Sequence, residues 1–120
     1  MPITIEPHKP LANLQPMLLK AIPDAEERRV VARLIAILLD RGFAVRVHDG
    51  EEWAMTAPSF APAAICKEVA ATDRTVLAVY GTNMKRIGTF DLVHGNGEDV
   101  IHDHTAGDLW NEVFETAIAG

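Results

Sequence analysis

The chain has 120 residues, 48% of them apolar and 23% charged, which is the composition of one globular domain and excludes a disordered chain. Its net charge is −6, and its single cysteine, Cys66, excludes an intramolecular disulfide. No apolar run is long enough to span a bilayer and the start does not resemble a signal peptide, so we expect a cytoplasmic protein that contacts no membrane.

The charge is distributed unevenly along the chain. Residues 1–86 hold all 11 Lys and Arg and 10 Asp and Glu, a net charge of +1, whereas residues 87–120 hold 7 acids and no Lys or Arg, a net charge of −7. These acids are Asp91, Glu98, Asp99, Asp103, Asp108, Glu112 and Glu115. Because phosphate groups are bound by cations, we expect no direct contact with nucleic acid; the acids favour a basic protein partner or a cation instead.

The first 16 residues contain four prolines, which favour an extended arm with an edge strand over residues 3–6. A short helix is predicted over residues 16–22. A long helix then begins after Asp24, a typical N-cap with Glu27 three residues later, and ends at Gly42, a left-handed C-terminal cap. Apolar residues recur in it at helical spacing, and its arginines are expected on a solvated side.

After Gly42 the apolar period changes to two, which predicts a strand over residues 43–47. Asp49-Gly50 is a hairpin turn signal, so residues 51–55 are expected to return as a partner strand. A second main helix is predicted over residues 62–71, with Pro62 in its first turn.

The remaining chain reads as a strand meander over residues 75–80, 86–93 and 99–104, followed by a third main helix that Thr105 caps. The predicted fold is therefore a single α+β domain, residues 1–120 with 1–16 as an arm. Antiparallel hairpins of about four to five strands pack against three main helices.

The hairpin around Asn96-Gly97 allows a register to be counted. With a two-residue turn, Val93 pairs with Val100, Leu92 with Ile101, and Asp91 with His102, whereas a bulged loop would shift the pairing by one. In the first register Asp91, His102 and His104 share one side of the sheet. Two imidazoles and a carboxylate could hold zinc or iron and activate water, or the three could be ordinary polar residues at a sheet end.

Two further chemical interpretations compete with structural ones. Cys66 could be a nucleophile, but it falls on the apolar side of the predicted helix, as a core cysteine does. Gly95-Asn96-Gly97 resembles part of a phosphate-binding loop, but no P-loop lysine follows, and a hairpin turn explains both glycines. We therefore assign no catalytic residue and no cofactor.

Two segments carry a family resemblance: 45–52, a strand followed by Asp-Gly-Glu, and 87–105, with Gly-Asn-x-x-Asp-Val-Ile-x-Asp. They resemble an uncharacterised family of small proteins associated with phages and prophages. The likeness covers residues 43–107, and the chain departs from the pattern at His94 and His104, where aromatic residues are common. The resemblance implies the fold and a phage-like origin, and no activity.

The leading hypothesis is a non-enzymatic, phage-like accessory protein. Its acidic C-terminal surface would bind a basic protein surface or a nucleoprotein complex, for example as an inhibitor of a host nucleoprotein or defence complex. The alternative is a small metal-dependent enzyme centred on Asp91, His102 and His104. A homodimer joined through a sheet edge or through the helix bearing Trp110 and Phe114 is a third hypothesis.

Overall fold

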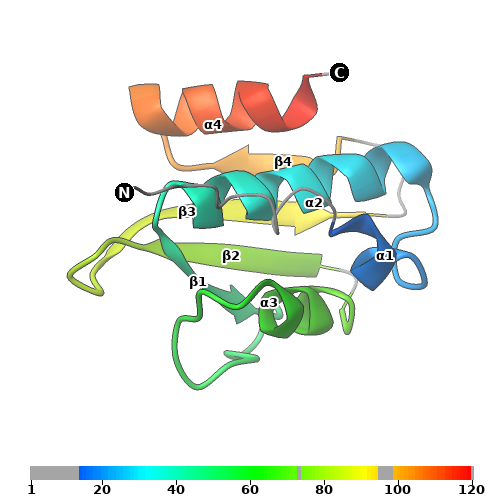
Figure 1. Cartoon of the computed structure of the whole chain (residues 1–120), viewed down its shortest axis with the longest axis horizontal. Helices are drawn as coiled ribbons and strands as arrows, with labels where there is room; N and C mark the ends of the chain where they lie inside the picture. Colours follow the sequence, from blue (N-terminus) through cyan, green and yellow to red (C-terminus); the bar gives the residue numbers. More distant parts are fainter. Residues whose placement is uncertain (1–13, 73, 95–98, 120) are drawn as a thin grey trace, which may run out of the picture.

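A computed structural model describes residues 14–72, 74–94 and 99–119. Four strands form one antiparallel sheet in the order β1-β2-β3-β4: β1 (Ala44–His48), β2 (Arg74–Tyr80), β3 (Arg86–Val93) and β4 (Ile101–His104). The helices are α1 (Gln15–Leu18), α2 (Ala25–Asp40), α3 (Pro62–Val69) and α4 (Asp108–Ile118). They lie on one side of the sheet (Figure 1), which confirms the predicted α+β class.

Strand alternation gives the sheet an inner and an outer face. The inner face packs against the helices and carries Val45, Val47, Leu77, Val79, Phe90 and Leu92, none more than 1% exposed. The outer face carries the residues between them, among them Arg46, His48, Val76, Ala78, Tyr80 and Asp91. β2 is interior to the sheet, as its continuous apolar run predicts.

α4 crosses the inner face where β3 has no side chain. A Cβ on Gly88 would lie 2.7 Å from Cζ2 of Trp110, so only glycine lets the indole ring sit against the strand. Trp110 is 7% exposed and meets the ring of Phe90 edge-on, with 6.0 Å between centroids. On the helix face that was predicted to join a homodimer, Trp110 therefore packs against the sheet of its own chain.

The caps of α2 are as predicted. Asp24 has extended backbone and its side chain accepts a hydrogen bond from the Glu27 N–H at 2.9 Å. Gly42 has a φ of 87°, the left-handed conformation that ends the helix. The cap predicted for α4 is wrong: its N-cap is Gly107, with a φ of 137° and no side-chain hydrogen bond. Thr105 instead accepts from the Thr89 N–H at 2.9 Å, between β3 and the end of β4.

The partner strand predicted over residues 51–55 does not form. Residues 49–61 pair with β1 only as isolated bridges, His48 with Trp53 and Val45 with Ser59. Trp53 lies over Arg46, whose guanidinium carbon is 4.1 Å from the ring centroid. The segment therefore covers part of the outer face. The predicted strand over residues 3–6 lies outside the described residues.

The β3–β4 register follows the predicted count for two pairs and then departs from it. Val93 donates to the Val100 carbonyl at 2.8 Å and Leu92 pairs with Ile101, but Asp91 pairs with Asp103 and not with His102. A bulge after Ile101 leaves His102 as the extra residue. It turns His104 inward and Asp103 outward, so that an aromatic ring and not a carboxylate faces the helices.

Candidate partner-binding site

A pocket of about 190 Å³ opens between the first turns of α2, β4 and the C-terminal half of α4. Its floor is apolar, formed by Val30, Val100, Ile101, Phe114 and Ile118. Three carboxylates complete the lining: Glu26, Glu27 and Asp99. We call this site the acidic pocket.

The acidic wall of the pocket follows from the way α2 begins. Acids are favoured in a first helical turn because the unpaired N–H groups there carry partial positive charge. The Glu26 carboxylate accepts from Arg29 at 2.7 Å, and this side-chain hydrogen bond lowers the pKa of Glu26. Glu26 is therefore charged at neutral pH, with its charge shared with Arg29.

Arg29 also fixes the opposite wall. Its guanidinium donates to the carbonyls of Ala119 at 2.7 Å and Ile118 at 3.2 Å, which are acceptors left free at the end of α4. The pocket walls are thus joined by one cation, which holds α4 against α2 beside the cavity.

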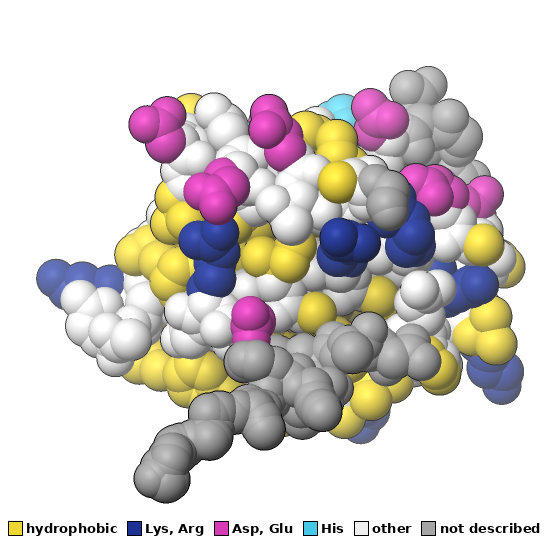
Figure 2. Space-filling view, turned by 45° about the horizontal axis from the view of Figure 1, so that its top comes forward, with side chains coloured by type: hydrophobic (Ala, Val, Ile, Leu, Met, Phe, Trp, Pro, Cys, Tyr) yellow, Lys and Arg dark blue, Asp and Glu magenta, His cyan; other side chains and the backbone are white. Residues whose placement is uncertain are grey.

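α4 carries an acidic ridge. Asp108, Glu112 and Glu115 recur at spacings of four and three, so they share one helical side, and all three are exposed. Glu112 pairs with Arg41, the residue that follows α2, at 2.9 Å. In Figure 2, acidic side chains lie along the upper part of the molecule and Lys and Arg side chains form a row below them.

The remaining predicted acids are dispersed. Asp91 and Asp103 face each other across β3 and β4 on the outer face, where Arg74 pairs with Asp91 at 2.8 Å. Such a pair of like charges is unfavourable, and Arg74 offsets it. Asp99 reaches the pocket, and Glu98 lies outside the described residues. The seven predicted acids do not form one surface: Asp99 lines the pocket, and the ridge lies on α4, the helix that supplies Phe114 and Ile118 to the pocket.

The metal set predicted from the sequence is not assembled. Asp91 is on the outer face, whereas His104 points inward and stacks between Phe90 and Phe114, with centroids 5.6 Å and 4.9 Å away. Nδ1 of His104 is 2.8 Å from the Thr105 carbonyl oxygen. Among the described residues, no group of three His, Cys, Asp or Glu side chains could hold a metal ion. The bulge at His102 is the reason.

Cys66 is a core residue. It is 0% exposed on the inner side of α3, and burial raises the pKa of its thiol to about 11. A thiol with that pKa is protonated at neutral pH and is a poor nucleophile.

The α2 residues of the pocket were not predicted as site residues. Glu26 and Glu27 read as ordinary first-turn acids and Val30 as core, because nothing local indicates that α2 meets the far end of the chain. The apolar stripe of the last helix, which includes Phe114 and Ile118, was the one available signal.

Comparisons with family models, curated proteins and solved structures find no match for this chain. The resemblance to phage-associated proteins therefore stays a prediction. In the described part of the chain, no helix has the length and apolar character needed to cross a membrane.

Proposed function

We propose that the chain is a non-enzymatic binding protein that takes up a basic side chain of a protein partner in the acidic pocket. The observation that carries this proposal is the lining: an apolar floor beside Glu26, Glu27 and Asp99. Lysine and arginine have the complementary shape, an apolar stem that ends in a cation.

The size of the pocket supports a side chain over a metabolite. Sites for drug-sized ligands are usually about 300–1,000 Å³, and this one is about 190 Å³. One inserted side chain would be an anchor, with the rest of the partner lying over the neighbouring surface.

The ridge on α4 extends the recognition surface beyond the pocket. Asp108 and Glu115 are exposed, and among the described residues neither of them belongs to an ion pair. Charges of this kind raise the association rate of a basic partner more than they raise its affinity. Binding should therefore weaken as salt is added.

The partner class that we propose is a basic surface of a nucleoprotein complex, such as a host defence complex inhibited by a phage-like accessory factor. The carboxylates that line the pocket and those of the ridge on α4 support this class, since a basic surface that holds nucleic acid also attracts carboxylates.

The test is affinity capture from a bacterial lysate, followed by titration of the captured partner. We expect Asp99→Lys with Glu115→Lys to weaken binding at least about tenfold, because each change sets a cation against the basic partner and like charges repel. The matched control is Glu51→Lys with Glu52→Lys, which changes the net charge equally on an exposed turn after β1. Equal weakening by both pairs, or no change with the first, would overturn the proposal.

A further inference from the structure

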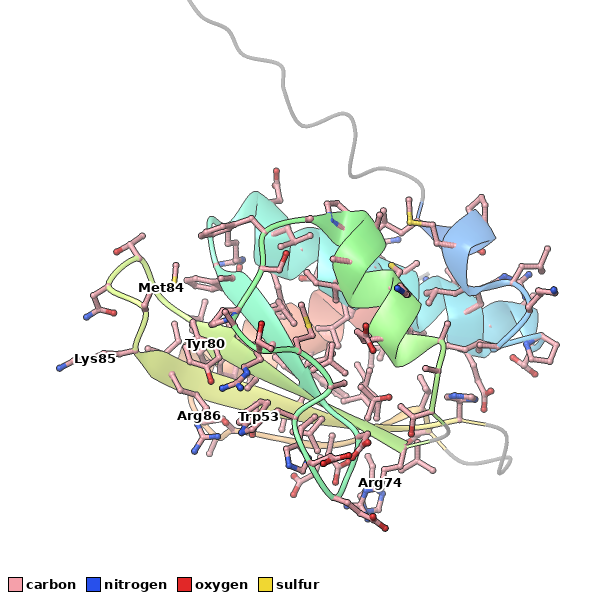
Figure 3. All side chains as sticks on the ribbon, turned by 90° about the horizontal axis from the view of Figure 1, so that it is seen from below. Trp53, Arg74, Tyr80, Met84, Lys85 and Arg86 are labelled. Carbon is pink, nitrogen blue, oxygen red and sulfur yellow. The ribbon has the colours of Figure 1, made fainter. Side chains whose placement is uncertain are left out.

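The outer face of the sheet has a basic end at the β2–β3 hairpin. Tyr80 pairs across the strands with Ala44 and Arg86, and Arg46 pairs with Ala78 on the same face. Lys85 immediately precedes β3. Figure 3 shows Tyr80, Arg86 and Trp53 near one another on this side, with Lys85 at the hairpin.

At this end the Arg46 side chain is held in place by contacts within the protein. The Arg46 guanidinium lies 4.1 Å from the Trp53 ring centroid, and its Nε donates to the Met55 carbonyl at 2.9 Å. Because both contacts fix the side chain, it gives up little conformational freedom on binding an anion.

The hairpin tip is also fixed. Gly81 donates to the Lys85 carbonyl at 3.0 Å, and Met84 donates to the Gly81 carbonyl at 2.9 Å. Met84 has a φ of 62°, a left-handed conformation that is uncommon for a residue with a side chain. The turn thus holds Lys85 and Arg86 exposed beside the sheet, and within the described residues neither takes part in an ion pair.

The acids of the outer side lie at its other end. β1 places Ala44 opposite Tyr80 and His48 opposite Val76, four residues farther along, and the acids of the turn over 49–52 follow His48. That is about 13 Å at the rise of a strand, which exceeds the screening length of about 8 Å in physiological salt. Asp91 is paired with Arg74.

We propose that this basic end binds single-stranded nucleic acid, with one base stacked on Tyr80 and the flanking phosphates on Lys85 and Arg86. Within the described residues the Tyr80 ring stacks on no other ring, and it is half-buried on the outer face of the sheet. Aromatic rings on a sheet accept unstacked bases, and nearby cations hold the backbone. A duplex offers no free base to stack.

This inference departs from the expectation of no nucleic-acid contact. That expectation rested on residues 87–120, which hold no Lys or Arg. The basic end draws on earlier residues, which the sheet brings together on the side away from α4.

The probe is a fluorescein-labelled oligothymidylate of about twelve nucleotides, titrated with the full chain by fluorescence anisotropy. With two or three phosphates contacted, we expect a Kd of about 10–100 μM in low salt and a slope of log K against log salt of roughly −1.4 to −2. Tyr80→Ala should weaken binding about tenfold, as loss of one stacked base does.

Arg86→Glu should also weaken binding about tenfold or more. Its matched control is Arg33→Glu, the same charge change at an exposed position of α2, on the helix side. Circular dichroism checks that each variant is folded. If the Tyr80 variant does not fold, the comparison of Arg86→Glu with Arg33→Glu tests the proposed binding.

Three outcomes would overturn the proposal. They are no binding in 50 mM salt, equal weakening by Arg33→Glu and Arg86→Glu, and equal affinity for a duplex or for an oligoglutamate peptide, which would mark a surface for polyanions in general.

Discussion

The inner and outer faces of the sheet are made of adjacent residues with different surroundings. Leu77 and Phe90 are 0% exposed beneath the helices, whereas their neighbours Val76 and Asp91 are only half-buried on the outer face. The inner face also has a glycine, Gly88, whose missing side chain leaves room for the ring of Trp110. Because the two faces alternate residue by residue, stability and recognition can be changed separately along one strand.

The largest expected effect on stability comes from removing an aromatic ring from the inner face, compared with removing one from the outer face. Phe90→Ala should lower the free energy of unfolding by about 3–5 kcal/mol, because it opens a cavity in the core. Tyr80→Ala should cost about 1 kcal/mol or less, because its side chain is half-buried. Urea unfolding followed by circular dichroism measures both, and equal losses would contradict the assignment of the faces.

The next effect tests the close approach of α4. Gly88→Ala should cost about 1–3 kcal/mol, the usual penalty of an overpacked core. The added Cβ would meet Cζ2 and Cε2 of Trp110 at 2.7 and 2.8 Å. Trp110→Leu removes that ring, so the double variant should lose at least about 0.5 kcal/mol less than the sum of the single losses. Strictly additive losses would show that the two residues do not meet.

A chemical probe tests whether the inner side is closed. Burial raises the pKa of the Cys66 thiol from 9.0 to about 11, so at pH 8 its thiolate fraction falls about a hundredfold. We expect a disulfide reagent to label the folded chain at least about a hundredfold more slowly than the chain in urea. Equal rates would place the thiol in contact with solvent.

The smallest effect lies at the acidic end of the outer side. The Asp49 carboxylate accepts from the N–H groups of Glu52 at 2.8 Å and Glu51 at 2.9 Å, which lower its pKa below the ordinary 3.8. A carboxyl with a lowered pKa stabilises the fold above its ordinary pKa and loses that effect as pH falls through the lowered one.

Asp49→Asn keeps an acceptor oxygen and removes the charge. It should be slightly less stable than the parent at pH 6, and the difference should shrink as the pH falls below 3.8, through the lowered pKa of Asp49. Thermal unfolding across this range measures it. A difference that grows as the pH falls would contradict the assignment.

Much of the fold could be predicted because its signals are local. The N-cap at Asp24 and the left-handed glycine at position 42 act within one helical turn, so the sequence around them suffices to place α2. The pairs Val93 with Val100 and Leu92 with Ile101 follow from counting outward from a turn.

The register beyond Ile101 could not be predicted in this way. The bulge at His102 depends on which side chains of β4 pack against α4, and in the structure the ring of His104 stacks on Phe114. The acidic pocket could be predicted only in part for a similar reason. Asp99 stood out through its charge, whereas Glu26 and Val30 join it through the packing of α2 against α4.

The contact between Arg29 and Ala119 spans 90 positions, so closing it costs more chain entropy than closing any hairpin of the sheet. Contacts of such large separation usually form late in folding. The end of α4 should therefore be the part of the pocket that opens most readily, at a free energy below that of global unfolding. Hydrogen exchange of the Ala119 amide, compared with that of Leu77 in β2, would measure how often the pocket is open. A partner that closes it would slow that exchange.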